Sequence, residues 1–204
     1  MGSLRCSPDR RSGCAPPATV TSARLVLASG SPQRRAILAQ LGLDFDVVVP
    51  DVEEVGEGEP AALVIENALR KARAVAGPLV LGADTAVALD GRVYGKPQDE
   101  REAETFLAAL SGRVHEVHSG IALIEDGDEQ TASAVTEVRF RDLDEPTLRW
   151  YLDSGEWEGR AGGYAIQGRG AALVERIDGD YLNVVGLPVS TLLHLKPSLP
   201  LSHR

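Results

Sequence analysis

The chain has 204 residues, of which 43% are hydrophobic and 25% charged, and its formal net charge is -9. These values are typical of one soluble globular domain with a sizeable core, and the negative charge argues against a nucleic-acid coat while allowing a local basic pocket. No stretch approaches the roughly 20 apolar residues that a membrane span needs, and the two cysteines, Cys6 and Cys14, do not build a disulfide framework or a metal site.

The chain begins and ends with segments that lack a core pattern. Residues 1–22 are rich in Arg, Ser, Pro and Gly without an apolar run, which predicts a disordered extension with no secretory signal. Residues 197–204 are predicted to form a loose tail, so that a single domain is expected over 23–196. We expect a cytoplasmic protein that binds neither nucleic acid nor membranes.

The segment from Leu25 to Arg35 holds the first strong signal. A short apolar strand runs into a Ser-Gly-Ser turn, and Ser31 followed by Pro32 predicts the start of a helix that Gly42 ends. Arg34 and Arg35 then lie in the first helical turn, where the helix dipole disfavours cations. A bound anion would resolve this conflict, because helix N-termini bind phosphate; two solvated arginines are the alternative.

Further along the chain, apolar periodicity and turn residues predict alternating strands and helices. Strands are predicted near 47–49, 79–81, 86–89, 92–94, 114–124, 131–140, 164–167 and 171–177, and helices over 60–76, 99–110, 145–152 and 188–195. Hairpin signals at Asp90-Gly91 and Asp126-Gly127 interrupt the strand–helix–strand rhythm. The sequence therefore predicts an α/β domain with a mixed, twisted sheet flanked by helices.

Two polar residues follow predicted strands closely. Asp84 comes soon after the apolar strand 79–81, and ligands of α/β folds collect beyond the carboxyl ends of strands. Its carboxylate can bind a metal or act as a base there, although a turn former is an equally good interpretation. Lys96 stands between Gly95 and Pro97, which restrict its backbone and aim its side chain; an exposed turn lysine is the simpler alternative.

The predicted helix over 60–76 carries polar residues on two faces. Glu66 and Arg70 are spaced as a surface ion pair, whereas Asn67 and Lys71 share another face from which Lys71 can reach a pocket over the sheet edge. The acidic loop over 51–59 before this helix suits a divalent cation or is merely solvated.

Gln167 lies in a glycine-rich segment, 162–168, that allows close approach of a ligand. Its amide offers a donor and an acceptor, as the edge of a nucleobase requires. His115 and His118 are three apart in a predicted strand, so they point to opposite faces and do not form a joint metal site.

Common motifs for covalent catalysis and for phosphate or dinucleotide binding are absent from the predicted domain. It contains no Gly-x-Ser-x-Gly, no P-loop, no Gly-x-Gly-x-x-Gly and no cysteine. Cationic side chains, carboxylates and a glutamine suit metal-assisted phosphoryl chemistry better.

Taken in order, these segments resemble the Maf family of nucleotide pyrophosphatases, whose fold is related to that of the inosine triphosphate pyrophosphatases (the Maf/Ham fold). The resemblance runs from about Leu25 to Leu195. The segments that carry it are Leu27–Pro32, Glu66–Ala68 with Lys71-Ala72, Asp84-Thr85, Gly95–Pro97, Leu110–His115, Gly163–Gly168 and Asn183–Pro188.

The resemblance implies hydrolysis of the α–β phosphoanhydride of a nucleoside triphosphate to a monophosphate and pyrophosphate. The positions that match the family's site are Ser29, Arg34, Glu54, Lys71, Asp84, Lys96 and Gln167. Asp84 would act as the general base or as a metal carboxylate, and Mg²⁺ or Mn²⁺ would take Glu54 and Asp84 as ligands. Lys71, Lys96 and Arg34 would neutralise the triphosphate.

The resemblance also bears on substrate choice and assembly. Members with Asp-Thr, as at Asp84-Thr85, tend to prefer dTTP and UTP, which makes Thr85 and Gln167 candidates for base selection. The family usually reads Ser-Pro-Arg-Arg, whereas here Gln33 replaces the first arginine and Arg35 adds a cation one place on, which can substitute only if it turns inward. A homodimer is implied as well.

Two other functions fit the same residues. A nucleotide-binding regulator of cell division or septum formation needs the same cations without turnover. A nucleotidyltransferase also opens with a Ser-Gly-Ser turn followed by arginine, and passes the nucleotide to an acceptor other than water.

Overall fold

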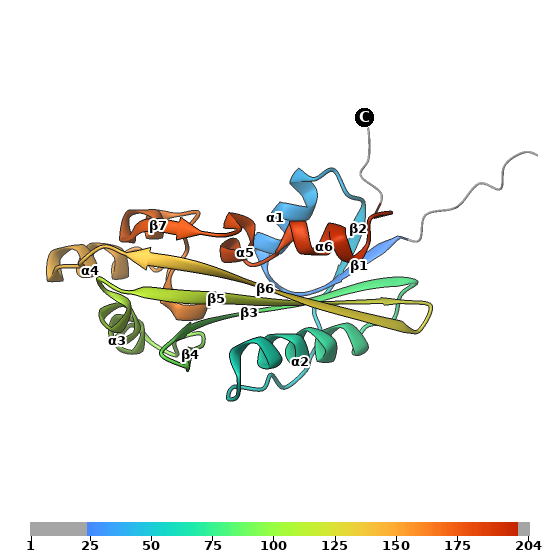
Figure 1. The fold of residues 1–204 in the computed structure, drawn as a ribbon, viewed down its shortest axis with the longest axis horizontal. Helices are drawn as coiled ribbons and strands as arrows, with labels where there is room; N and C mark the ends of the chain where they lie inside the picture. Colours follow the sequence, from blue (N-terminus) through green and yellow to red (C-terminus); the bar gives the residue numbers. More distant parts are fainter. Residues whose placement is uncertain (1–23, 200–204) are drawn as a thin grey trace, which may run out of the picture.

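A computed structural model describes residues 24–199, so the predicted extension over 1–22 and the last five residues of the predicted tail lie outside the described residues. Figure 1 shows one long twisted sheet with helices on both sides. The elements are β1 (Leu25–Ala28), α1 (Pro32–Gln40), β2 (Phe45–Val48), α2 (Pro60–Arg73), β3 (Leu79–Leu89), β4 (Arg92–Tyr94), α3 (Glu100–Leu110), β5 (Val114–Glu125), β6 (Asp128–Phe140), α4 (Glu145–Leu152), the 3-10 turns η1 (Ala161–Gly163) and η2 (Arg169–Leu173), β7 (Val174–Asp178), α5 (Tyr181–Val185) and α6 (Val189–Leu195).

The sheet confirms the predicted mixed topology. Its order is β2-β1-β3-β5-β6-β7, with β4 paired to the far part of β3. The strands β2, β1 and β3 run parallel, and β5, β6 and β7 continue the sheet as antiparallel strands. The hairpin between β3 and β4 turns at Asp90 and Gly91, both with positive φ, as the Asp-Gly signal predicts.

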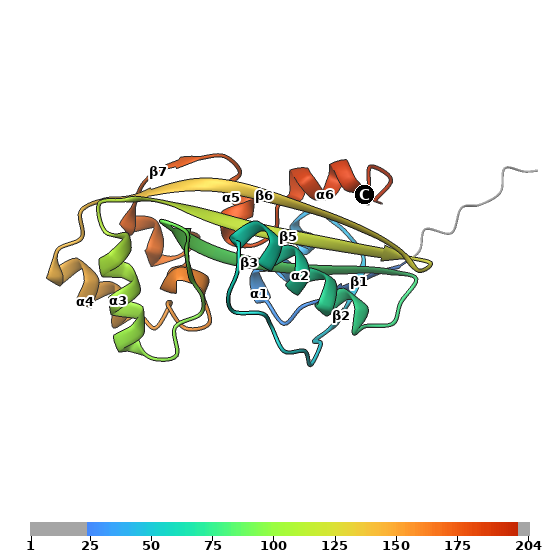
Figure 2. The same ribbon diagram turned by 60° about the horizontal axis from the view of Figure 1, so that its bottom comes forward.

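The residues of β1 alternate between the two faces of the sheet. Leu25 and Leu27 belong to a cluster with residues of α1 and α6, whereas Val26 and Ala28 pack with Ala68 and other residues of α2. Figure 1 shows α2 below the sheet and α1, α5 and α6 above it, and in the turned view of Figure 2 α2 lies in front of the sheet. Alternation therefore buries both faces.

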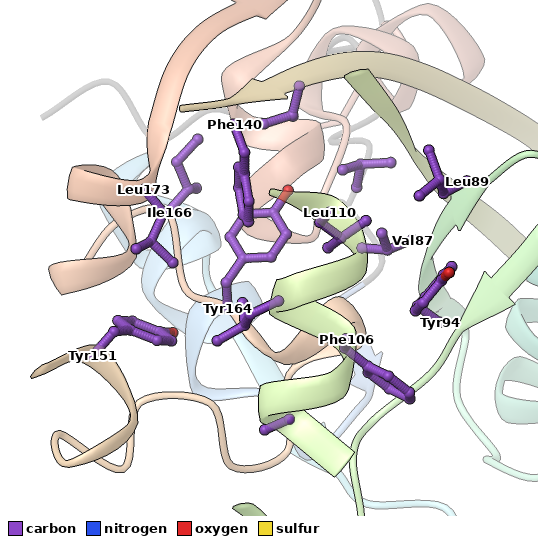
Figure 3. Packing of buried hydrophobic residues seen from close by; sticks show 14 of the residues in the cluster. Val87, Leu89, Tyr94, Phe106, Leu110, Phe140, Tyr151, Tyr164, Ile166 and Leu173 are labelled. Carbon is purple, nitrogen blue, oxygen red and sulfur yellow. The ribbon is translucent and has the colours of Figure 1, made fainter. Parts of the chain in front are cut away.

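A third group of buried side chains lies at the other end of the long strands, where α3 and α4 pack. It is rich in aromatic rings (Figure 3), and Phe140 and Tyr164 meet edge to face with ring centroids 4.8 Å apart. This cluster supports the segment between α4 and β7, which carries Tyr164 and Gln167.

Glycines bring α2 unusually close to the sheet. A Cβ at Gly82 of β3 would collide with the carbonyl oxygen of Ala68, and one at Gly120 of β5 would collide with the backbone of Val64. Because α2 lies directly on the sheet backbone, its side chains reach β3, as the small residues at Ala68 and Ala72 suggest.

Several sequence predictions need correction. The strand predicted over 79–81 continues to Leu89, so Asp84 lies inside β3 rather than beyond its end; pairing with β5 outweighs the weak strand propensity of Gly82 and Asp84. Parallel pairing of β3 with β1 nevertheless ends at Gly82, so Asp84 lies beyond the carboxyl end of β1.

The second half of the chain was predicted less well. The strand predicted over 164–167 is wrong, because this glycine-flanked segment forms turns, and the strand predicted over 171–177 begins only at Val174. Helix α2 ends at Arg73 rather than at residue 76, and the short helix α5 was not predicted. Leu199, in the predicted loose tail, is buried against the cluster of α1 and α6. No helix within residues 24–199 is long and apolar enough to cross a membrane.

Candidate active site

A cavity of about 550 Å³ opens where β1 ends and β3 continues. Its wall combines the turn before α1 and the start of that helix, the loop before α2, α2 itself, the middle of β3, β5, the segment around Lys96, the segment between α4 and η2, and the end of α5. Nine of the predicted site residues line it: Ser29, Gln33, Arg34, Glu54, Lys71, Asp84, Thr85, Lys96 and Gln167. The structure therefore brings these nine residues, which come from six separate segments of the chain, to one place.

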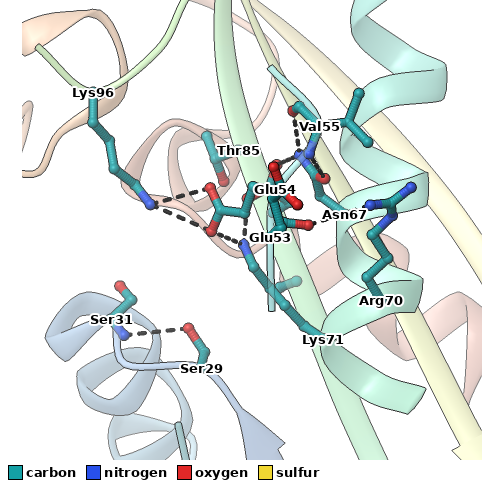
Figure 4. Close-up of polar contacts among 12 residues, drawn as sticks. Ser29, Ser31, Glu53, Glu54, Val55, Asn67, Arg70, Lys71, Thr85 and Lys96 are labelled. Carbon is teal, nitrogen blue, oxygen red and sulfur yellow. Dashed lines mark hydrogen bonds and ion pairs between the residues drawn. The ribbon is translucent and has the colours of Figure 1, made fainter. Parts of the chain in front are cut away.

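The start of α1 forms one wall of the cavity. Ser31 caps the helix, accepting a hydrogen bond from the backbone N–H of Arg34 at 3.4 Å, and its own hydroxyl donates to Gln33 Oε1 at 3.1 Å. The backbone N–H of Ser31 donates to Ser29 Oγ at 3.2 Å (Figure 4). These bonds fix the Ser-Gly-Ser turn at a helix N-terminus, where an anion is stabilised.

Arg34 is buried and its guanidinium is held by four hydrogen bonds. It donates to Gly186 O at 2.8 Å, Ala83 O at 2.9 Å, Ser29 Oγ at 3.1 Å and Thr85 Oγ1 at 3.1 Å. Burial lowers its pKa, an effect that the charges of Asp84 and Glu54 partly offset. None of the four acceptors is a carboxylate, so Arg34 is a fixed cation whose charge no directly bonded acid of the described part of the chain neutralises.

A second buried cation lies on the opposite face of β3. Lys71 Nζ is 2.6 Å from Asp84 Oδ1 and 2.8 Å from Glu54 Oε1, and Asn67 Nδ2 donates to Asp84 Oδ2 at 3.0 Å. Figure 4 shows Lys71 reaching Glu54 from α2, as the spacing of Asn67 and Lys71 suggests. Both oxygens of Asp84 are therefore oriented by α2.

Glu54 lies between two lysines. Lys96 Nζ is 3.4 Å from Glu54 Oε2, and both side chains are partly exposed. Burial would raise the pKa of Glu54, but the ammonium groups of Lys71 and Lys96 outweigh it and lower the pKa. Glu54 is thus held in its charged form.

The acidic loop is positioned by α2 through its backbone. Asn67 binds both the N–H and the carbonyl of Val55, at 2.7 and 3.0 Å, and Arg70 donates to the carbonyl of Glu53 at 3.3 Å. Arg70 also forms the predicted surface pair with Glu66, at 2.7 Å. Asn67 consequently links the placement of Glu54 to that of Asp84, a role that the sequence did not reveal.

Thr85 does not present its hydroxyl as a free base-selecting group. It follows Asp84 in a strand, so it faces the other side of β3, where its Oγ1 accepts from Arg34 and lies 2.9 Å from Ser119 Oγ. Although Thr85 lines the cavity, these contacts make it a support for Arg34.

The remaining predictions divide between the cavity wall and the surface. Gln167 lines the cavity and is exposed, and Val87, Val117, Val184 and Val185 contribute apolar surface to the same cavity. Arg35 is exposed and outside the cavity wall, so the structure does not bring it inward to compensate for Gln33.

The cavity also contains residues that sequence reasoning missed. Arg160 lines it from the segment before η1, and Gly186 supplies the carbonyl for Arg34. Arg160 could have been noticed in the sequence, because it is a basic residue that stands just before Gly162 and Gly163. His115 and His118 bond different partners, Tyr164 and Glu116, as expected for opposite faces.

The donor set fits a divalent cation that is shared with phosphates. Glu54 and Asp84 converge on one point, now bridged by Lys71, and residues 24–199 contain no group of three His, Cys, Asp or Glu side chains placed to hold a metal. Two carboxylates with the remaining ligands from phosphate and water is the arrangement that Mg²⁺ prefers.

Comparisons with known proteins agree with the sequence resemblance. A family model described as Maf-like protein matches residues 24–196. A dTTP/UTP pyrophosphatase of Symbiobacterium thermophilum is 51% identical over 172 residues, covering 81% of this chain and 89% of that protein. The proteins of the same name from Thermococcus gammatolerans and Deinococcus radiodurans are 49% and 46% identical, covering 84% and 86% of this chain and 95% and 92% of theirs. A structure of the Staphylococcus aureus Ham1 protein matches with a TM-score of 0.44 and 19% identity, covering 58% of this chain and 72% of that chain.

Proposed function

The chain belongs to the Maf family, and from this premise we propose that it is a nucleoside triphosphate pyrophosphatase acting on dTTP and UTP. It hydrolyses the bond between the α- and β-phosphates and releases the nucleoside monophosphate and pyrophosphate. The substrate names come from relatives that are 46–51% identical over more than 80% of the chain.

The observation that carries the proposal is the buried triad of Lys71, Asp84 and Asn67 in a cavity that also holds Arg34 and Lys96. Triphosphate hydrolysis needs charge compensation and an aligned water more than it needs a protein nucleophile. A carboxylate with both oxygens oriented, beside fixed cations, meets this need.

In the proposed reaction, a water oxygen attacks the α-phosphorus and transfers a proton to the carboxylate of Asp84. The bond between the α-phosphorus and the bridging oxygen breaks, and its electron pair leaves with pyrophosphate. Arg34, Lys71 and Lys96 stabilise the negative charge that moves onto the phosphate oxygens, and Ser29 and Gln33 contact the phosphates at the start of α1.

We assign Glu54 and Asp84 as the protein ligands of Mg²⁺ or Mn²⁺. When bound, the ion supplies further neutralisation of the phosphates. The protein needs such help because four cationic and three anionic side chains line the cavity, so its own excess of positive charge is small. Pyrophosphate release that is lost with a chelator and restored by Mg²⁺ or Mn²⁺ would support this assignment, and undiminished release in the chelator would contradict it.

We assign recognition of the base to Gln167 and to the apolar wall of Val117, Val184 and Val185. Uracil and thymine share the carbonyl and N–H groups that a glutamine amide can bind. Thr85 contributes indirectly, by holding Arg34. Residues 23–196 form the catalytic domain in this proposal, and a homodimer is a prediction that sedimentation would test.

The test is a product assay on a panel of triphosphates that includes dTTP, UTP, dCTP, dATP and GTP. We expect pyrophosphate and monophosphate in equal amounts, with dTTP and UTP turned over fastest. One-to-one binding without turnover would instead indicate a nucleotide-binding regulator. Release of pyrophosphate only with a sugar phosphate acceptor, yielding a nucleotide sugar, would indicate a nucleotidyltransferase.

A further inference from the structure

Arg160 belongs to the cavity wall but has no part in the contacts described above. Its segment is fixed to the one that carries Lys96, because the N–H of Gly162 donates to the carbonyl of Gly95 at 3.0 Å. Gly162 also lies against Val87 of β3, where a Cβ would not fit. Arg160 and Lys96 therefore stand on two segments that are hydrogen-bonded to each other at the rim of one cavity.

The four cationic side chains of the cavity differ in the hydrogen bonds and ion pairs that they already make with the protein. Arg34 makes four hydrogen bonds, Lys71 bridges two carboxylates, and Lys96 contacts Glu54. Within residues 24–199, the guanidinium of Arg160 makes no hydrogen bond or ion pair, and its Nε is buried without a partner. A half-buried guanidinium without an acceptor is unfavourable, and a native structure that keeps one calls for a reason.

We propose that Arg160 is a further substrate-binding residue, which donates hydrogen bonds to the polyphosphate of the bound nucleotide on the side where Lys96 lies. This inference rests on the proposed function, since it takes the ligand to be a triphosphate. A guanidinium binds two phosphate oxygens at once and keeps its charge at any accessible pH. Arg160 thereby supplies hydrogen-bond donors that no protein group engages within residues 24–199, whereas those of Arg34 already bond carbonyl and hydroxyl oxygens and the two lysines pair with carboxylates.

The experiment measures binding of inorganic tripolyphosphate, which has no base, by calorimetry in the presence of Mg²⁺. The variants are Arg160→Gln, Arg160→Lys and the matched control Arg169→Gln, which loses the same charge from an exposed arginine that lies over the ring of Trp150. We expect about tenfold weaker binding for Arg160→Gln, about threefold for Arg160→Lys, and no change for Arg169→Gln. Thermal unfolding of each variant shows whether the fold is retained, and Arg160→Lys keeps the test decisive if Arg160→Gln does not fold.

Binding of tripolyphosphate that is unchanged in Arg160→Gln would overturn the inference, as would a wild-type protein that does not bind tripolyphosphate. Weaker binding of thymidine with unchanged binding of tripolyphosphate would also overturn it, because Arg160 would then contact the base. Failure of the proposed function is distinguishable: a protein that binds tripolyphosphate through Arg160 but releases no pyrophosphate from dTTP would refute the activity alone.

Discussion

The two faces of β3 hold two buried cations in different ways. On the α2 side, Lys71 is bonded to the carboxylates of Asp84 and Glu54, so its charge is neutralised where it stands. On the α1 side, the partners of Arg34 within residues 24–199 are all carbonyl and hydroxyl oxygens, so its position is fixed while its charge stays available. The strand β3 thus carries the oriented carboxylate of Asp84 on one face. On its other face, it helps to hold the guanidinium of Arg34 through the carbonyl of Ala83 and the hydroxyl of Thr85.

This difference suggests a division of labour. The α2 side depends on Glu54, which comes from an irregular and partly exposed loop, and it offers carboxylates for a metal and for water. The α1 side is joined by hydrogen bonds to the backbone at Ala83 and Gly186 and is built to hold one geometry. Preorganised charge of this kind is an effective way to stabilise a transition state.

The largest effect on turnover is expected for a substitution of Asp84, on the α2 side of β3. We expect Asp84→Asn to lower pyrophosphate release from dTTP by about 100- to 1000-fold, because the neutral amide neither accepts the proton of water nor acts as a good metal ligand. Glu54 continues to neutralise Lys71, so the loss of unfolding free energy should not exceed about 3 kcal/mol. Turnover within tenfold of the wild type would remove Asp84 from the mechanism.

A substitution that keeps the charge of Arg34 tests the fixed cation. Arg34→Lys should reduce turnover by about 10- to 100-fold and the unfolding free energy by about 2–4 kcal/mol, because one ammonium cannot serve the four acceptors of the planar guanidinium. Urea unfolding and steady-state kinetics measure both effects. If Arg34→Lys retained wild-type turnover, charge alone would suffice and the fixed geometry would be unnecessary.

A substitution at Thr85 tests whether this residue supports Arg34 or contacts the base of the substrate. Thr85→Val removes an acceptor of Arg34 and a partner of Ser119, so we expect the unfolding free energy to fall by about 1–2 kcal/mol and turnover by roughly two- to tenfold. Because the effect passes through Arg34, dTTP and UTP should be affected equally, and their preference over dCTP should persist. Gln167→Leu serves as the comparison, since it should change that preference; a changed preference in Thr85→Val would show that Thr85 contacts the base.

The smallest effect on turnover is expected at His115, which supports the cavity wall through Tyr164. Burial lowers the pKa of His115 from 6.5 to about 4, so between these pH values the unfolded chain binds a proton that the folded chain does not. The stability of the folded state is therefore complete above pH 6.5 and decreases toward pH 4, by at most roughly 3 kcal/mol. His115→Gln should flatten this part of the stability profile and leave turnover near neutral pH within about threefold, whereas an unchanged slope would contradict the assignment.

The features that could be predicted from the sequence are those that depend on neighbouring residues in the chain. Local rules suffice for α1, where Ser31 caps the helix and Pro32 occupies its first turn, and for the Asp90-Gly91 hairpin. The helical spacing of Asn67 and Lys71 indicated a shared polar face, and the glycine and alanine pattern allowed α2 to lie close to β3.

What could not be predicted depends on contacts between distant segments. Long antiparallel pairing with β5 continues β3 through Asp84 and decides that Thr85 faces Arg34. The segment 164–167 contains strand-forming residues, but its flanking glycines turn the chain, and none of the strands between residues 24 and 199 pairs with it. The helix start singled out Arg34, the flanking Gly95 and Pro97 singled out Lys96, and the family resemblance assigned both to one site, whereas Arg160 was found only in the wall of the cavity.

The central claim is that water attacks the α-phosphorus within this cavity. The most direct test is hydrolysis of dTTP in water enriched in ¹⁸O, with mass spectrometry of both products. The account predicts one ¹⁸O atom in dTMP and none in pyrophosphate. Label in pyrophosphate, or release of orthophosphate in its place, would contradict it.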